Sequence, residues 1–207
     1  MSTSDPTEFE PEVDLLRRYE RMIQTQVETL TSIDQKAARV ARLIGLLIGV
    51  VLSAVSIVVG SGAEIQTNEL LLTAHSAVAG VALSVALTQA VITYLSSTFE
   101  YGPSSELGSF MSEHRVTQTD YKNHLLRGYS SAVERNHGVV VANARRFQRC
   151  LASFLVGIVF TATASVVLVA TPNRPVAVST SVMAVAIAGV LAHYVTREEY
   201  LTLGRQL

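Results

Sequence analysis

The amino-acid sequence predicts an all-α protein, an integral membrane four-helix protein with cytoplasmic helical extensions. Three observations lead to this prediction. The first is composition, because the 207 residues are 49% hydrophobic and only 16% charged, whereas soluble domains average about 25% charged residues. The second is four windows of 18, 26, 21 and 21 residues, at 43–60, 70–95, 151–171 and 175–195, that contain no Asp, Glu, Lys or Arg. Each can cross a hydrocarbon core about 30 Å thick, which needs around 20 helical residues.

The third observation is the distribution of the 16 basic residues. Six precede the first window, seven lie between the second and third, two follow the fourth, and only Arg174 lies in the remaining loops. Cytoplasmic loops of membrane proteins are rich in Lys and Arg, so this pattern predicts that both termini and the central segment are cytoplasmic. We therefore expect a multi-pass protein of the cell (plasma) membrane.

Residues 1–10 form an acidic stretch that we expect to be disordered. The stretch has neither the basic region nor the short apolar region of a secretory signal. The apolar stretch that begins near residue 43 is therefore expected to act as the insertion signal and to stay in the protein. At the other end, residues 196–207 are expected to form a cytoplasmic tail.

Residues 11–60 are expected to form one cytoplasmic amphipathic helix that continues into the first transmembrane segment. Pro11 suits the first turn of a helix, where its missing N–H has no intrahelical partner to lose. No further Pro or Gly occurs until Gly45. Apolar residues at helical spacing define a predicted stalk face, which includes Leu16, Ile23, Val27 and Leu30.

Residues 97–149 are expected to form a cytoplasmic loop and a second amphipathic helix, which leads into the third window. Gly102 and Pro103 indicate a break, and Thr119 with Asp120 is the expected helix cap. Two amphipathic helices that enter the membrane from the same side are expected to pack as a parallel pair. The same apolar stripe serves pairing within one chain or between two copies, so both arrangements stay open.

Small residues recur every fourth position in the predicted transmembrane helices. Such stripes let helix backbones approach closely in a membrane, although a chain rich in small residues also produces them by chance. We expect them to mark helix-packing surfaces of a bundle, either within one chain or in an oligomer. The candidate residues are Gly45, Gly49 and Ser53 in the first window, Ser76, Gly80 and Ser84 in the second, and Ser153 and Gly157 in the third.

Two polar side chains are the candidate intramembrane sites, His75 and Gln89. His75 is either a proton-sensitive group that faces a pore or a partner in an interhelical or headgroup contact. Gln89 is expected to bond between helices. Ion-coupled transporters usually need an intramembrane charge, and these windows contain none, so a transporter is disfavoured.

Enzymatic motifs are missing from the sequence. It contains no phosphate-binding Gly-Lys-Ser loop, no H-E-x-x-H motif and no nucleophile elbow, and its five histidines are scattered. We therefore predict no enzyme activity, no cofactor and no metal site. The single cysteine, Cys150, excludes an internal disulfide; at a membrane boundary it is either an acylation site or a small apolar side chain.

Charged and small residues alternate immediately before the first window. Asp34, Lys36, Arg39 and Arg42 are the candidate coupling region between the cytoplasmic helix and the membrane. The alternative is a basic collar that binds anionic headgroups and fixes the orientation of the helix.

The Asp34-x-Lys36-Ala37 pattern lies on a helix that continues into a span, with Gly45 soon after and a later basic amphipathic helix before another span. This arrangement resembles small prokaryotic multi-span membrane effectors of nucleotide-signalled antiphage systems, of the Pycsar transmembrane and SLATT types. The resemblance covers roughly residues 12–60. In that family the first span often carries a polar Asn, whereas residues 43–52 are aliphatic or Gly. The resemblance implies a non-enzymatic membrane disruptor triggered by a cytoplasmic nucleotide, with Asp34 and Lys36 in the coupling region.

The expected function is that of an oligomeric membrane effector that alters permeability in response to a cytoplasmic signal. The alternative is a membrane scaffold whose helical stalk recruits a soluble partner, and a small transporter or membrane enzyme is less favoured. The expected partners are membrane lipid, further copies of the chain, and a cytoplasmic nucleotide or protein. Nucleic acid is not expected.

Overall fold

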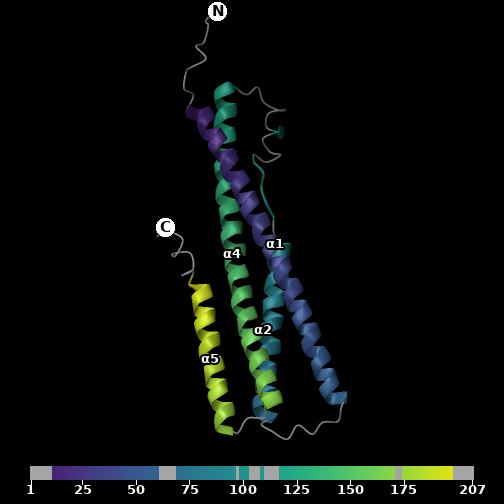
Figure 1. Ribbon diagram of the computed structural model, residues 1–207. Helices are drawn as coiled ribbons and strands as arrows, with labels where there is room; N and C mark the ends of the chain where they lie inside the picture. The colour runs from purple at the N-terminus through teal and green to yellow at the C-terminus, as the bar shows by residue number, and fades with distance from the viewer. Residues whose placement is uncertain are drawn as a thin grey trace, which may run out of the picture. The chain divides into compact units, whose positions relative to one another are not determined.

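A computed structural model of the protein describes residues 11–60, 69–96, 98–102, 108–109, 117–170 and 174–197. In this part of the chain four long helices occur and no strand: α1 (Pro11–Gly60), α2 (Glu69–Leu95), α4 (Gln118–Ala170) and α5 (Arg174–Thr196) (Figure 1). All four are long and apolar enough to cross a membrane. These findings confirm the predicted all-α chain with four candidate membrane spans. The predictions for residues 1–10 and for the tail beyond residue 197 lie outside the described residues.

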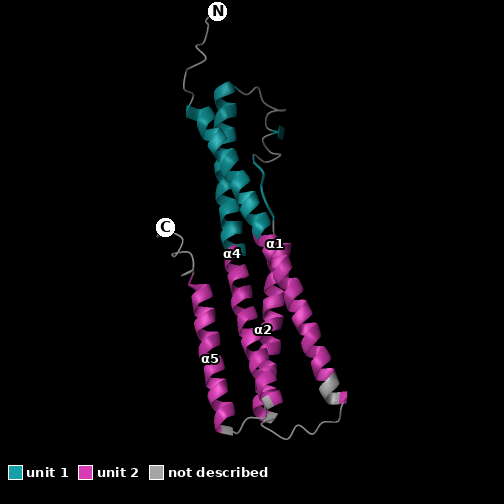
Figure 2. Cartoon of the chain, in the orientation of Figure 1, with its two compact units in different colours: residues 1–32, 97–143 teal, residues 33–96, 144–207 magenta. Residues whose placement is uncertain are grey.

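The chain divides into two compact units (Figure 2). Unit 1 contains residues 1–32 and 97–143, and unit 2 contains residues 33–96 and 144–207. Helices α1 and α4 contribute residues to both units, whereas α2 and α5 belong to unit 2.

Side chains in or next to the first turn stabilise the N-terminal ends of α1 and α4. Glu12 and Asp14 lie in the first turn of α1, where carboxylates complement the positive end of the helix dipole. The expected cap of α4 at Thr119 is wrong by two residues. Thr117 Oγ1 accepts the N–H of Asp120 at 3.2 Å and donates to the Asp120 carboxylate at 2.6 Å. This reciprocal pair satisfies a backbone donor that the first turn leaves without an intrahelical partner.

Buried positions recur every seven residues along the two longest helices. The repeat contains Ile23, Leu30, Ala37 and Ile44 in α1, and Asn136, Asn143, Cys150, Gly157 and Ala164 in α4. A seven-residue repeat corresponds to 3.5 residues per turn, which is the periodicity of left-handed coiled coils. Among the described side chains of α1 these four are the only buried ones, so α1 buries one narrow seam. Helix α4 buries a broader surface, because Ala132, Ala152, Thr163 and Val167 are buried as well.

In unit 1, α1 and α4 form a parallel pair within one chain. Three contacts join them in matching order: Glu12 with Lys122 at 3.4 Å, Glu20 with the Tyr129 hydroxyl at 3.5 Å, and the Gln26 side-chain amide with the Val133 carbonyl at 3.1 Å. Of the predicted stalk residues, Ile23 and Leu30 are buried, and Leu16 and Val27 are half-buried. The stalk face is thus covered inside the chain, which is one of the two arrangements that periodicity left open.

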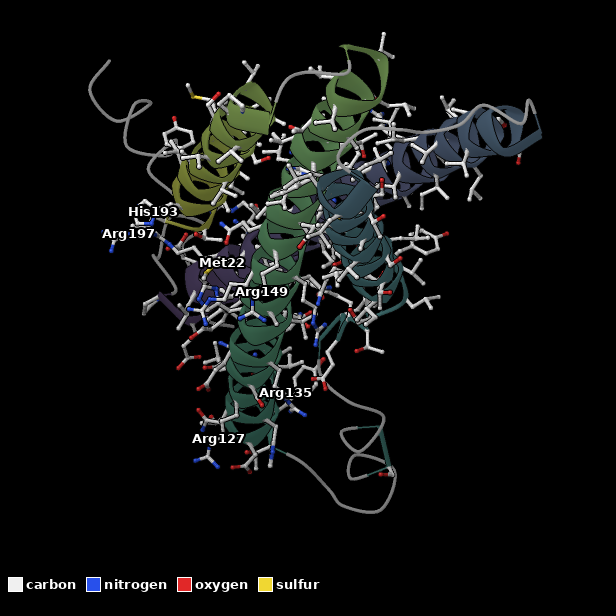
Figure 3. All side chains as sticks on the ribbon, turned by 90° about the horizontal axis from the view of Figure 1, so that it is seen from below. Met22, Arg127, Arg135, Arg149, His193 and Arg197 are labelled. Carbon is white, nitrogen blue, oxygen red and sulfur yellow. The ribbon has the colours of Figure 1, made fainter. Side chains whose placement is uncertain are left out.

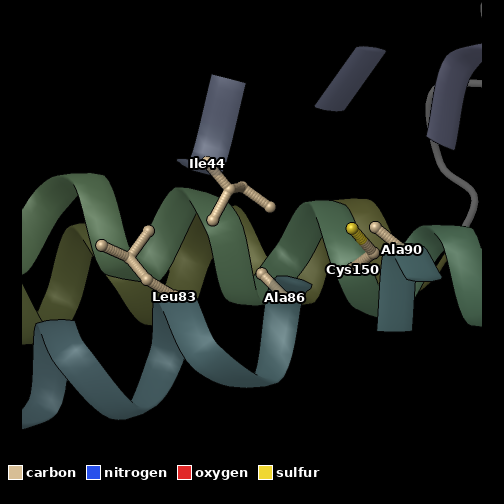
Figure 4. Close-up of a cluster of buried hydrophobic side chains, with 5 residues drawn as sticks. All are labelled: Ile44, Leu83, Ala86, Ala90 and Cys150. Atoms are coloured by element: carbon tan, nitrogen blue, oxygen red, sulfur yellow. The ribbon is translucent and has the colours of Figure 1, made fainter. Parts of the chain in front are cut away.

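In unit 2, α2 packs antiparallel to α4 over small residues. The buried core contains Ile44, Leu83, Ala86, Ala90 and Cys150 (Figure 4). Leu83 lies against Gly157, so closely that an added Cβ would approach its side chain to 2.6 Å. The glycine therefore provides the space that the leucine fills.

Replacing Gly157 with Val should destabilise unit 2, because the new side chain overlaps Leu83. Overpacking of this kind costs about 1–3 kcal/mol of unfolding free energy. Thermal unfolding in detergent micelles, followed by circular dichroism, measures the loss. Gly189→Val is the matched control, because no atom lies within 4 Å of a Cβ at Gly189. In a Leu83→Ala background Gly157→Val should cost less, and an equal cost in both backgrounds would contradict this contact.

Candidate functional site

An asparagine in the buried seam of unit 1 holds an extended segment, residues 98–102, against α4. Asn136 Oδ1 accepts the N–H of Glu100 at 3.0 Å, and Asn136 Nδ2 donates to the Glu100 carbonyl at 2.7 Å. The side chain is 1% exposed. One amide thus satisfies both backbone groups of Glu100, as a neighbouring strand would.

Further contacts fix the same segment. The Glu100 carboxylate pairs with Arg135 at 3.1 Å, and Arg135 also donates to the Ser131 hydroxyl at 2.7 Å. Gly102 has a φ of +147°, and a Cβ there would lie 3.2 Å from the Tyr129 ring. Only glycine adopts that backbone conformation without strain.

Tyr129 links the segment to α1. Burial, and then the nearby Glu20 carboxylate, raise the pKa of the Tyr129 phenol above its usual value. The phenol therefore stays protonated at physiological pH and remains a donor to Glu20, with an oxygen separation of 3.5 Å. Sequence reasoning missed this cluster, which we call the Asn136 clamp, because Asn136 and Glu100 lie 36 positions apart and no local pattern joins them.

Basic side chains gather at one end of unit 2, where α2 ends. Six of them are exposed, namely Lys36, Arg39 and Arg42 on α1, Arg145 and Arg149 on α4, and Arg197 after α5. Figure 3 labels Arg149 and Arg197 among them. A seventh, Arg146, is half-buried and donates from Nη1 to the Ser96 hydroxyl at 2.9 Å. The last turn of α2 has no basic residue of its own. Arg146 therefore brings a cation to the negative end of that helix dipole.

The predicted coupling residues divide between two faces of α1. Asp34 is half-buried, whereas Lys36, Arg39 and Arg42 are exposed. The carboxylate thus lies toward the packed side of the helix, next to the seam residue Ala37. The three cations are accessible to a ligand from outside the chain.

The two predicted intramembrane polar residues differ in burial. His75 is 5% exposed, its Nδ1 contacts the Leu71 carbonyl at 2.5 Å, and its ring lies 5.6 Å from that of Phe160 on α4. Its hydrogen bond is therefore made within α2 rather than between helices. Gln89 is half-buried, and its side chain makes no hydrogen bond to another described residue.

The predicted small-residue stripes also separate into two groups. Gly157 is buried and Ser153 is half-buried, so the stripe of α4 packs inside unit 2. In α1 and α2 the stripes are exposed, and they contain Gly45, Gly49, Ser53, Ser76, Gly80 and Ser84. The buried face of α2 instead consists of His75, Ala79, Leu83, Ala86, Ala90 and Thr93.

The described residues contain no group of three or more His, Cys, Asp or Glu side chains that could hold a metal ion. Comparison with protein families, with curated proteins and with solved structures finds no match to this chain.

Replacing Asn136 with Ala should release residues 98–102 from α4, because the Glu100 amide loses its acceptor. Loss of such bonds costs about 1–3 kcal/mol, which corresponds to roughly 5- to 150-fold faster amide exchange. Hydrogen exchange of the peptide that contains Glu100, followed by mass spectrometry, measures this change. Asn123→Ala, at an exposed position of α4, is the control and should leave the exchange unchanged. Equal exchange in both variants would exclude the clamp.

Cys150 should not react with a soluble maleimide in the folded protein, because it is 0% exposed within the core of unit 2. Labelling followed by mass spectrometry should show modification only after unfolding in sodium dodecyl sulfate. Ser130→Cys, which places a thiol at an exposed position of α4, is the positive control and should react readily. Modification of Cys150 at the rate of that control would contradict its burial and would reinstate the acylation hypothesis.

Proposed function

We propose that this chain is a non-enzymatic membrane protein that assembles into oligomers and alters membrane permeability in response to a cytoplasmic signal. The observation that carries the proposal is the exposure of α1. Only 6% of its most apolar window is buried inside the chain, against 22%, 28% and 17% for the windows of α2, α4 and α5. A helix with so little intrachain packing has most of its surface free for lipid or for another copy.

The exposed face of α1 has the features of a helix-packing surface. Gly45, Gly49 and Ser53 line an open groove together with Leu46, Val50 and Ala54. Nothing lies within 4 Å of a Cβ built at either glycine. The Ser53 hydroxyl donates to the Gly49 carbonyl at 2.8 Å, so it can be covered by an apolar surface without losing its hydrogen bond. Close backbone approach at such stripes is a recurrent mode of helix association in membranes.

A second copy of the chain suits this groove better than lipid tails do. Lipid covers any apolar helix equally, whereas glycines at every fourth position favour a partner with a ridge and groove of the same spacing. The same face of a second α1 provides that spacing and forms a two-fold symmetric contact. This reasoning supports an oligomer built on α1.

Unit 1 is the part proposed to receive the signal. Helices α1 and α4 pass through it and continue without a break into their apolar segments. A ligand that changed the packing of unit 1 would therefore act on helices that also belong to unit 2. The likeness of the Asp34-x-Lys36-Ala37 region to nucleotide-signalled membrane effectors supports a nucleotide as the signal, and the basic distribution supports cytoplasmic termini.

The alternative function, a scaffold that recruits a soluble partner, is favoured by a different observation. Leu15 and Met22 are 40% and 47% exposed in unit 1, and their spacing of seven residues places them on one face of α1. Tyr101 is 76% exposed in the same unit. Contiguous exposed apolar side chains are typical of protein contact sites, and Leu15 and Met22 would form part of such a patch.

Membrane potential after induced expression, measured by dye fluorescence, should separate the two functions. The effector should depolarise the cell, whereas Gly45→Leu with Gly49→Leu should abolish depolarisation and chemically cross-linked oligomers, because leucines fill the groove. Gly189→Leu is the matched control, since Gly189 is equally exposed but lies outside any stripe. Ile23→Asp with Leu30→Asp, which buries charge in unit 1, should also prevent depolarisation. Normal potential with the intact chain at equal expression would favour the scaffold.

A further inference from the structure

The six exposed cations at the end of unit 2, Lys36, Arg39, Arg42, Arg145, Arg149 and Arg197, define a surface that we call the basic end. None of them forms an ion pair within the described part of the chain. The only carboxylate described near them is Asp34, which is half-buried. The sequence continues with Glu198 and Glu199, so cations outnumber carboxylates even when both glutamates are included. A surface this basic needs an anionic partner or counterions.

Unit 1, by contrast, has nearly equal numbers of acidic and basic side chains. The described residues of unit 1 contain seven carboxylates and six basic side chains. Three pairs among them lie within ion-pair distance, namely Arg18 with Asp14, Lys122 with Glu12, and Arg135 with Glu100. Excess positive charge is therefore specific to one end of unit 2.

The packing of unit 2 brings these cations to one level. Ile44 of α1, Ala90 of α2 and Cys150 of α4 share one cluster, so the turns immediately before Ile44 and Cys150 lie beside the end of α2. Helix α5 begins four residues after α4 ends and has 23 residues. Its last turn therefore returns to about the level of Arg149. Arg146, fixed by its bond to Ser96, lies within the same layer.

Exposed apolar surface begins directly beside this layer. Arg42 is followed by Leu43, which is 53% exposed, and by Leu46, which is 67% exposed. A ligand that satisfies both surfaces needs a negative group and hydrocarbon chains a few ångströms apart. Anionic phospholipids have this structure, whereas a free nucleotide offers no hydrocarbon for the adjoining leucines.

We propose that the basic end of unit 2 binds the phosphate groups of anionic phospholipids and selects them over zwitterionic ones. The exposed Arg side chains donate charge-assisted hydrogen bonds to phosphate oxygens, while the acyl chains cover the apolar surfaces of α1 and α4. This selection requires that unit 2 lies in a membrane, but it does not require that the protein alters permeability.

The test uses the full chain reconstituted in vesicles of phosphatidylglycerol and phosphatidylcholine. Native mass spectrometry of the extracted protein measures the ratio of the two retained lipids, relative to the ratio in the vesicle. Each Lys or Arg near a membrane surface strengthens anionic binding about fivefold. Arg145→Gln with Arg149→Gln should therefore lower the enrichment of phosphatidylglycerol about 25-fold. Arg145→Lys with Arg149→Lys keeps both charges and should retain most of it.

The matched control removes two positive charges from unit 1 instead. Arg17→Gln with Arg127→Gln alters two exposed arginines whose side chains form no ion pair with a described residue, and it should leave the enrichment unchanged. Helix content by circular dichroism should be equal in all variants. The proposal would be overturned if the intact chain retained both lipids in the ratio of the vesicle. It would also be overturned if the control variant lost as much phosphatidylglycerol enrichment as Arg145→Gln with Arg149→Gln. If inorganic phosphate displaced phosphatidylglycerol from the protein more than chloride does at equal ionic strength, the basic end would be assigned to a soluble phosphate instead.

Discussion

The seven-residue repeat of buried positions along α1 and α4 is the constraint on which both units depend. In α1 this repeat buries one side chain in every two turns and leaves the remaining faces available, whereas α4 also buries residues on other faces. In unit 1 the seam of α1 consists of large apolar residues, Ile23 and Leu30, whereas α4 presents Ala132 and Asn136. Large side chains from one helix therefore meet small or polar ones from the other, and the pair can approach closely without overlap.

Small residues also allow close packing in the candidate membrane-spanning helices, but the driving force for that packing differs. Apolar side chains gain little from leaving lipid for protein, so packing there depends on contact and not on the hydrophobic effect. The buried faces of α2 and α5 consist mostly of alanines, and Leu83 fits against Gly157. Helix α1 shares only its seam with this core and keeps its glycine face outside. Unit 2 thus contains one closely packed helix pair, α2 with α4, and one helix, α1, whose glycine face is not covered by the chain.

Sequence reasoning was strongest where one physical quantity decides the outcome. Four uncharged windows predicted four long apolar helices, and the absence of Pro and Gly before Gly45 predicted the unbroken α1. It was weaker for side-chain roles. The small-residue stripes of α1, α2 and α4 have the same spacing, yet only that of α4 is packed inside the chain. Burial depends on whether another helix lies against the stripe, and the spacing alone does not reveal this. The Asn136 clamp joins residues 36 positions apart, so no local pattern reveals it.

The clamp also has a consequence for how this protein can change during evolution. The Asn136 side chain forms hydrogen bonds with the backbone N–H and carbonyl of Glu100, and neither bond depends on the side chain at position 100. Other residues at position 100 keep these two bonds, with proline excluded because it lacks the N–H, although they lose the ion pair with Arg135. Position 136 is more restricted, because its side chain must provide an acceptor and a donor on two separate atoms, as the asparagine amide does. Among homologues, variation should accumulate in the segment that is held, while the residue that holds it stays fixed.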